Sequence, residues 1–282
     1  MLWVVSCIIS ETRNEESRMS LQNTKIGFLG FGNMAQAMAK GWVRPGNIEP
    51  SNLYATARNI EKLERNTESL GIQAIASTEE MIQKVDIVVL AVKPYQIQSV
   101  VEPVKELLKD KIIFSVAANF PFEKFKEFLS EEFSHVSSVP NTPVSIGEGI
   151  IVVEETHSLS EEEWSLLEEA LKMLGLVQQV PTEQLDIGGT LAGCGPAFAS
   201  MFLEALADGA VKYGLSRADA YALASQMISG TGKMYLETNE HPGVMKDKVT
   251  SPGGTTIKGV AALEEHGFRN AVIQAFDAIE GE

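Results

Sequence analysis

The chain has 282 residues, 44% of them hydrophobic, and a formal net charge of -15 from 38 acidic and 23 basic side chains. This length exceeds a typical single domain and can bury a sizeable core, so we expect two domains. The acidic excess repels phosphates and anionic headgroups, which argues against nucleic acid and membrane surfaces as partners. The two cysteines, Cys7 and Cys194, lack disulfide or metal-ligand spacing, which fits a cytoplasmic protein.

The first residues, MLWVVSCII, are apolar but carry no basic group, and Glu11, Glu15 and Glu16 follow soon after. The run is too short to span a membrane and is built unlike a signal peptide. We therefore expect residues 1–21 to form a disordered extension, with Met19 as an alternative translation start.

Residues 22–180 have the pattern of an α/β domain. From Lys25 the chain reads KIGFLGFG, AQAMAKGWV and NLYATAR, which predicts a strand, a helix and a second strand. Residues 86–92 and 111–117 are branched apolar runs typical of parallel strands that are covered on both faces. Helices are expected at 60–70 and 97–108, a short strand at 149–153, and a helix at 160–174 that Ser160 caps.

Residues 181–282 lose the strand-like runs and are rich in alanine, which predicts an all-helical second domain. Helices are expected at 197–213, at 217–238 and from Thr256 to the end. In residues 198–211 apolar side chains cover most of the helix circumference, more than a small bundle can hide. We expect these helices to be buried in a homodimer.

A glycine motif lies between the first strand and the first helix. Gly30, Gly32 and Ala35 give the pattern GxGxxA, in which glycines allow a tight turn and close approach of a pyrophosphate to the helix N-terminus. The strand-turn-helix context favours a dinucleotide site over a purely structural turn. The expected contacts include three neighbours of the motif: Leu29, Asn33 and Met34.

The end of the second strand indicates which dinucleotide is bound. NAD-binding domains usually place an acidic residue there for the ribose hydroxyl, whereas this chain has Thr56 and Arg58, which suit a 2′-phosphate. We therefore expect NADPH, with NADH as a weaker cofactor. The alternative is that Arg58 is an ordinary solvated residue.

Residues that follow later strands are expected on the nicotinamide side, because ligands of open α/β sheets gather at the carboxyl ends of strands. They are Ala91, Val92, Lys93, Pro94, Ala117 and Ala118. The turn at Asn141 and Thr142 is a further neighbour. Lys93 could equally be an ordinary charged residue at a strand end.

The stretch DKVTSPGGTT, residues 247–256, precedes the last helical pattern. Ser251, Gly254, Thr255 and Thr256 would bring backbone N–H groups and hydroxyls together at a helix N-terminus, as in a small site for a carboxylate. A plain helix cap is the alternative interpretation. The four histidines lie outside the glycine-rich segments. Enzymes that resemble hydroxyacid dehydrogenases carry a catalytic lysine just after a run such as GGTLAGCG, whereas here Pro196, Ala197 and Phe198 follow it directly. The pattern therefore favours an imine, which can arrive already protonated, over an alcohol that needs a base.

These motifs resemble those of pyrroline-5-carboxylate reductase. The resemblance runs from about Lys25 to the end and rests on the glycine loop, AVKP at 91–94, NTP at 141–143, GCGPA at 193–197 and above all DKVTSPGGTT. It implies NADPH-dependent reduction of 1-pyrroline-5-carboxylate to L-proline on a Rossmann-type domain joined to a helical dimerisation domain.

The resemblance also implies roles for residues and an assembly. Ser251, Gly254, Thr255 and Thr256 would hold the substrate carboxylate and ring nitrogen, with the Thr256 hydroxyl nearest the imine. Active sites would be completed across a homodimer, and many members form a decamer of five dimers.

Two departures from the family pattern stand out. The chain has Ala192-Gly193-Cys194-Gly195-Pro196-Ala197-Phe198 where Ser-Gly-Ser-Gly-Pro-Ala-Tyr is usual, and Asn119 where Ala-Ala-Gly ends. Two other functions remain open. One is reduction of another cyclic imine or of a deazaflavin, and the other is a non-catalytic NADP-sensing protein.

Overall fold

The computed structural model describes residues 21–130 and 132–281. The chain divides into two compact units, the first ending at Gly193 and the second beginning at Cys194, and each is described by itself. Of the expected N-terminal extension, only Leu21 is among the described residues, and its side chain is buried.

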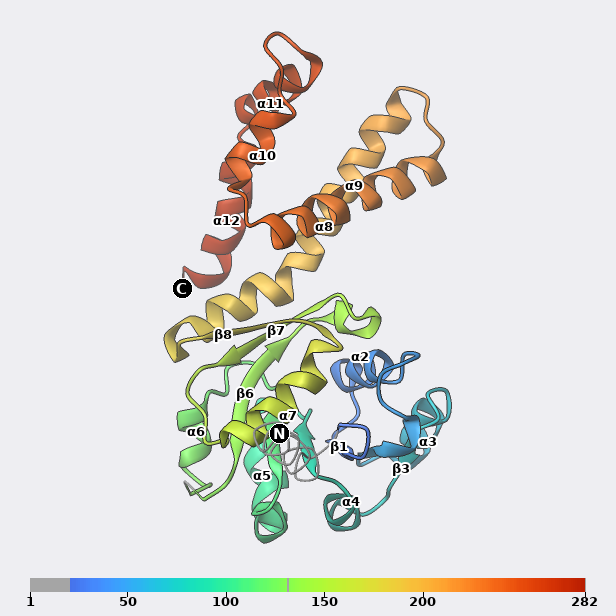
Figure 1. The fold of residues 1–282 in the computed structure, drawn as a ribbon, viewed down its shortest axis with the longest axis vertical. Helices are drawn as coiled ribbons and strands as arrows, with labels where there is room; N and C mark the ends of the chain where they lie inside the picture. The colour runs from blue at the N-terminus through green and yellow to red at the C-terminus, as the bar shows by residue number, and fades with distance from the viewer. Residues whose placement is uncertain (1–20, 131, 282) are drawn as a thin grey trace, which may run out of the picture. The chain divides into compact units, whose positions relative to one another are not determined.

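The first unit is built on an eight-stranded sheet with the order β3-β2-β1-β4-β5-β6-β7-β8 (Figure 1). Strands β1 to β6 run parallel to one another, β7 is antiparallel to β6, and β8 is parallel to β7. The strands are β1 (Ile26–Leu29), β2 (Leu53–Thr56), β3 (Gln73–Ala74), β4 (Ile87–Leu90), β5 (Ile112–Ser115), β6 (His135–Pro140), β7 (Gly149–Glu154) and β8 (Gly175–Val180).

Helices cover both faces of this sheet. On β4, Ile87 and Val89 belong to one buried cluster and Val88 and Leu90 to another, because successive residues of a strand point to opposite faces. The first cluster includes side chains from α2 (Asn33–Trp42), α3 (Ile60–Glu68) and α7 (Glu161–Lys172). The second includes α4 (Thr78–Lys84), α5 (Ile97–Val101), the 3-10 helix η3 (Glu102–Leu108) and α6 (Phe122–Lys126).

The Rossmann-type α/β fold expected from the sequence is confirmed, with three strands added. The sequence analysis did not predict β3, β6 or β8. The helix expected at 160–174 is α7, and Ser160 caps it: its hydroxyl accepts a hydrogen bond from the Glu163 amide at 3.2 Å, and the Glu163 carboxylate accepts one from the Ser160 amide at 2.8 Å. Four further 3-10 helices are η1 (Pro50–Asn52), η2 (Pro94–Gln96), η4 (Thr142–Ile146) and η5 (Thr182–Gln184).

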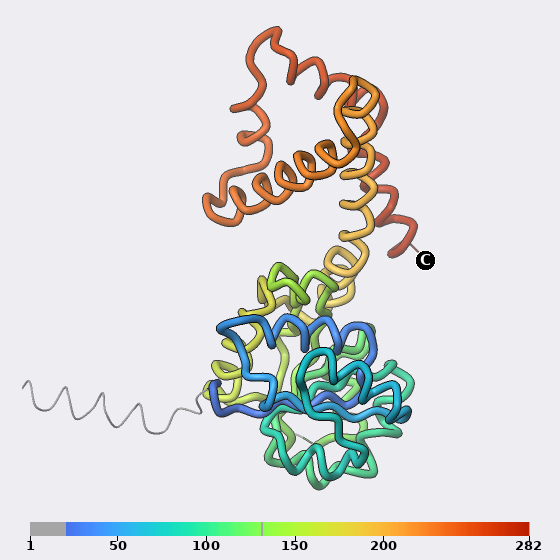
Figure 2. Tube along the Cα trace, turned by 90° about the vertical axis from the view of Figure 1, so that its right-hand side faces the viewer, coloured from blue at the N-terminus to red at the C-terminus, as the bar shows by residue number. Residues whose placement is uncertain are grey.

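The second unit is helical throughout its described residues. It holds the later part of α8 (Leu185–Lys212), then α9 (Arg217–Thr238), α10 (Pro242–Lys248), α11 (Thr255–Glu265) and α12 (Phe268–Glu280). Figure 2 shows α12 alongside α8, where the ring centres of Phe198 and Phe276 are 6.1 Å apart. Gly267, with φ of 73°, separates α11 from α12, so the single helix expected from Thr256 to the end is two helices.

Large apolar side chains remain exposed on these helices. The exposed fraction is 59% for Leu191, 70% for Met201 and 62% for Leu223. By length and composition alone, the segment Thr182–Lys212 could also cross a membrane, and only 11% of its most apolar stretch is buried in the single chain. An exposed apolar surface of this kind is typical of a site that is buried against another protein or in lipid.

Candidate active site

A cleft of about 1050 Å³ lies at the carboxyl ends of the parallel strands. Strand β1 pairs with β2 on one side and β4 on the other, so the chain order reverses beside β1. Open α/β sheets bind ligands at such a switch point. Residues that follow β1, β2, β4, β5 and β6 all line this cleft.

The structure brings almost all of the sequence-predicted cofactor residues to this cleft. Those that line it are Leu29, Gly30, Gly32, Asn33, Met34, Thr56, Arg58, Ala91, Val92, Lys93, Pro94, Ala117 and Ala118. Ala35 is the exception, because its side chain is fully buried in the core beneath α2. A small residue at that position lets the helix pack closely on the strand.

Gly30 makes the turn out of β1. Its φ is +91°, and a Cβ atom there would lie 2.7 Å from a methyl carbon of Val92 and 2.8 Å from the Ala91 carbonyl oxygen. Its amide donates to the Thr56 carbonyl at 3.0 Å. Any side chain at this position would be strained and would collide with the strand-end backbone.

The N-terminus of α2 is free to bind an anion. Gly32 caps the helix without a side-chain hydrogen bond, and the first turn holds no acidic residue. A Cβ atom on Gly32 would meet nothing within 4 Å, so the space in front of the helix amides is open. These features fit the pyrophosphate of a dinucleotide.

Opposite charges share the end of the cleft near β2. Arg58 is exposed, and within the described part of the chain its guanidinium has no hydrogen-bond or ion-pair partner. Glu79, in the first turn of α4, lines the same cleft and accepts a hydrogen bond from the Ser77 hydroxyl at 2.7 Å. That hydrogen bond lowers the pKa of the Glu79 carboxyl, so the group stays ionised at neutral pH.

Residues that follow β4, β5 and β6 line the other end of the cleft. The Lys93 carbonyl accepts a hydrogen bond from the Gln96 amide at 2.8 Å, which fixes the backbone turn into η2. Asn119 follows the lining residues Ala117 and Ala118 with φ of 59°. The family that the sequence resembles has glycine there, and asparagine is among the residues that best tolerate this conformation.

The sequence analysis missed several lining residues, which carry no local signal of their own. They come from the start of α4, the end of η2, from α5 and from η3, and include Thr78, Glu79, Gln96, Ser99, Val100, Pro103 and Val104. Thr142, expected as a neighbour, also lines the cleft.

In the second unit, the expected carboxylate site lies at the start of α11. Gly254 caps α11 without a side-chain hydrogen bond, and no acidic residue stands in the first turn. The Gly254 amide donates to the Ser251 carbonyl at 3.0 Å, which closes the turn. Ser251, Thr255 and Thr256 are exposed, so their hydroxyls and the helix amides are accessible to a small anion.

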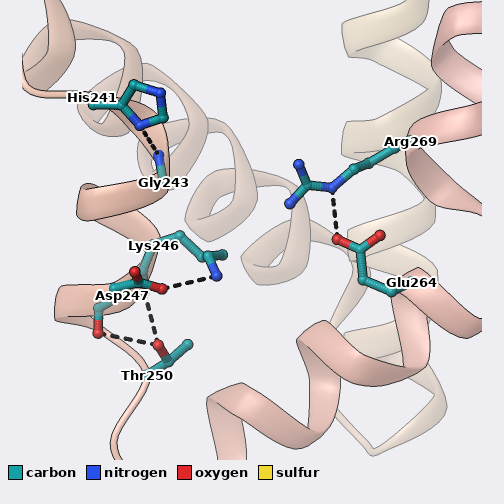
Figure 3. A network of polar contacts seen from close by, with 7 residues as sticks. All are labelled: His241, Gly243, Lys246, Asp247, Thr250, Glu264 and Arg269. Atoms are coloured by element: carbon teal, nitrogen blue, oxygen red, sulfur yellow. Dashed lines mark hydrogen bonds and ion pairs between the residues drawn. The ribbon is translucent and has the colours of Figure 1, made fainter.

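The segment before this loop is held by its own polar contacts (Figure 3). The Thr250 hydroxyl donates to the Lys246 and Asp247 carbonyls at 3.2 and 3.1 Å. The Gly243 amide donates to Nδ1 of His241 at 3.0 Å, at the start of α10. The Gly243 amide and the Thr250 hydroxyl thus have partners within this segment, whereas no side chain caps the first turn of α11.

The histidines have structural contacts. His135 stacks on Phe122 with ring centres 4.2 Å apart, and His157 stacks on Trp164 at 5.3 Å. Burial lowers the pKa of both imidazoles, which keeps them neutral at pH 7. Among the described residues no group of three or more His, Cys, Asp or Glu side chains could hold a metal ion.

Comparisons with known proteins place these features in a family. Residues 25–119 match the family model "NADP oxidoreductase coenzyme F420-dependent", and residues 182–281 match "Pyrroline-5-carboxylate reductase dimerisation". Pyrroline-5-carboxylate reductase of Treponema pallidum is 42% identical over 257 residues, which are 90% of this chain and 97% of the relative. The chain belongs to the pyrroline-5-carboxylate reductase family.

Solved members of the pyrroline-5-carboxylate reductase family share the fold. The Coxiella burnetii enzyme has 32% identity and a TM-score of 0.80, over 91% of this chain and 96% of that one. The Plasmodium falciparum pyrroline carboxylate reductase, solved with NADP bound, has 30% identity and a TM-score of 0.79 over 92% and 96%. The family match thus extends over both units of the chain.

Proposed function

We propose that this chain reduces 1-pyrroline-5-carboxylate to L-proline with NADPH, as a cytoplasmic homo-oligomer whose helical unit forms the dimer. The observation that carries the proposal is the cleft beside β1, which is lined by the glycine loop expected to bind a dinucleotide. The chain that contains this cleft is 42% identical to a pyrroline-5-carboxylate reductase. The NADP bound to the Plasmodium falciparum relative supports the choice of cofactor.

Bound NADPH supplies the hydride that the imine carbon accepts. The residues of the chain bind the cofactor and the substrate and orient them for this transfer. The amides at the start of α2 would hold the pyrophosphate, and Arg58 with Thr56 would bind the 2′-phosphate. The amides and hydroxyls of Ser251, Gly254 and Thr255 hold the substrate carboxylate, and the Thr256 hydroxyl bonds the ring nitrogen. No titratable acid is needed, because the imine arrives protonated.

The test is NADPH oxidation by the purified chain with and without 1-pyrroline-5-carboxylate. We expect a substrate-dependent rate, and a kcat/KM about 10- to 100-fold lower for 1-pyrroline, which lacks the carboxylate. A reduced deazaflavin in place of NADPH tests the other reductase function. NADPH binding without any substrate-dependent rate would overturn the proposal in favour of an NADP sensor.

Thr256→Ala should lower kcat about 10- to 1000-fold if its hydroxyl supports the transition state. Thr238→Ala is the matched control, because its exposed hydroxyl donates to the Met234 carbonyl at 2.7 Å, within α9. Steady-state kinetics of both variants make the comparison. Equal rates for the Thr256 variant and the unmodified chain would remove Thr256 from the mechanism.

A further inference from the structure

Asn141, between β6 and η4, has every polar group bonded while only 4% of its surface is exposed. Its backbone amide donates to the Ile150 carbonyl at 3.1 Å, and its carbonyl accepts from the Val144 amide at 3.3 Å. In the side chain, Oδ1 accepts from the Ile150 amide at 2.8 Å and Nδ2 donates to the Ala192 carbonyl at 3.0 Å. The residue thus joins three segments of the first unit.

The two hydrogen bonds between Asn141 and Ile150 extend the pairing of β6 with β7 by one residue pair. The register of β6 and β7 ends with Pro140 opposite Ile151, so Asn141 faces Ile150. A hydrogen-bonded antiparallel pair exchanges two backbone bonds. Here the side-chain Oδ1 takes the place of the Asn141 carbonyl, which has turned toward Val144. The backbone can therefore leave the sheet for η4 while the pairing with β7 continues.

The Nδ2 bond satisfies a carbonyl that α8 itself cannot satisfy. Pro196 lies inside α8, and proline has no N–H to donate to the carbonyl four residues earlier. That carbonyl belongs to Ala192, which is 2% exposed. A buried carbonyl without a partner is costly, so the Asn141 amide compensates for the proline.

Thr142, the next residue, lines the cleft. Strand β6 is four places from β2 in the sheet order, about 19 Å at the usual strand spacing, so Thr142 lies far from the Arg58 end. We infer that Asn141 is a positioning residue: its side-chain bonds to Ile150 and Ala192 hold Thr142 in the nicotinamide half of the cleft. This inference rests on the proposed function for the identity of the cofactor.

The test separates the two halves of the cofactor. Asn141→Ala removes both side-chain bonds, and Asn141→Asp keeps the acceptor for Ile150 but loses the donor for Ala192. We expect both variants to bind NADPH about 10-fold more weakly and to lose about 10- to 100-fold in kcat. Their affinity for 2′,5′-ADP, which carries only the adenosine half, should change less than about 2-fold. If the alanine variant does not fold, the aspartate variant makes the same comparison.

The matched control is Asn52→Ala, which removes one bond from Nδ2 to the Gln22 carbonyl at 2.8 Å without touching a lining residue. Unchanged NADPH affinity in both Asn141 variants, or an equal loss for NADPH and 2′,5′-ADP, would overturn the inference. A wild-type chain that binds NADPH but does not turn over would refute only the proposed function, and the binding comparison would still test Asn141.

Pro196 offers a test of the second bond. In an Asn141→Ala background, Pro196→Ala gives residue 196 an N–H that can serve the Ala192 carbonyl. We expect the double variant to have a higher melting temperature than Asn141→Ala, and a larger gain than Pro196→Ala gives in the wild-type chain. Equal gains in the two backgrounds would show that the Ala192 bond is not what Asn141 supplies.

Discussion

Arg58 and Glu79 set the electrostatics of one end of the cleft. The guanidinium has no protein partner among the described residues, and the ionised carboxylate is held by Ser77. A 2′-phosphate would be attracted by the first and repelled by the second. We therefore expect the preference of the site for NADPH over NADH to depend mainly on Arg58.

Arg58→Ala should weaken NADPH binding about 10- to 100-fold, which corresponds to the loss of about 1.5–3 kcal/mol from a charge-assisted hydrogen bond. Binding of NADH, which has no 2′-phosphate, should change less than about 3-fold. Fluorescence titration with each cofactor measures this. Arg65→Ala removes the same charge from an exposed site in α3 and serves as control; a similar loss for both cofactors would show that Arg58 does not contact the phosphate.

At the residue scale, local motifs predicted most of the cleft lining because glycine turns and strand ends carry their own sequence signals. The role of the Asn141 side chain had no such signal. An asparagine before Thr-Pro is typical of a turn or helix cap, and only the pairing of β6 with β7 reveals that its Oδ1 replaces a backbone carbonyl.

At the scale of elements, strands with polar residues escaped prediction. Strand β6 begins His135-Val136-Ser137-Ser138, where a propensity argument finds no apolar run. Its two serine side chains are buried all the same, because partners come from elsewhere: the Ser137 hydroxyl donates to the Phe120 carbonyl and the Ser138 hydroxyl to the Ser115 carbonyl. Long-range hydrogen bonds of this kind leave no local pattern.

Strand β6 also makes stability depend on pH. His135 is 1% exposed, and among the described residues its Nε2 has no hydrogen-bond partner. Burial lowers its pKa, so the unfolded chain binds a proton more readily than the folded one. The contribution of His135 to the free energy of unfolding is therefore fully present above about pH 6.5 and is lost as the pH falls from there through the lowered pKa.

His135→Phe, which can keep the ring contact with Phe122, should reduce the loss of unfolding free energy between about pH 7 and pH 5. Urea unfolding at several pH values measures how steeply the free energy of unfolding changes with pH.

Two other groups contribute to the same pH dependence. His157, whose pKa burial also lowers, keeps its contribution in the variant. Glu154 acts in the opposite sense, because burial raises the pKa of its carboxyl and protonation at acid pH favours its folded state. An unchanged slope in the variant would contradict the assignment, and His266→Gln, at an exposed site, is the control.

At the scale of the whole molecule, the exposed apolar side chains of the helical unit bear on assembly. Residues 182–281 match a family model for dimerisation, which favours a protein partner over lipid as the cover of α8. The sequence alone predicted burial in a homodimer, because apolar side chains cover most of the circumference of this helix. The number of dimers that assemble does not follow from one chain, because it depends on contacts between dimers.

We expect the protein to have the mass of a dimer, or of ten chains if dimers assemble further, in light scattering at micromolar concentration. Replacing Met201 and Leu223 with glutamate should yield monomers, because charge on this surface opposes burial. Leu176→Glu, at a 44% exposed apolar position of β8, is the control and should leave the mass unchanged. A wild-type chain that is monomeric and fully active would contradict the dimer.

The proline in α8 also bears on how this chain can evolve. Because Asn141 serves a carbonyl that Pro196 leaves without a partner, the two positions are coupled although they lie 55 places apart in the sequence. A descendant that loses the proline first relaxes the demand on the asparagine, whereas one that loses the asparagine first carries a buried defect. Substitution at these two sites is expected to proceed in that order.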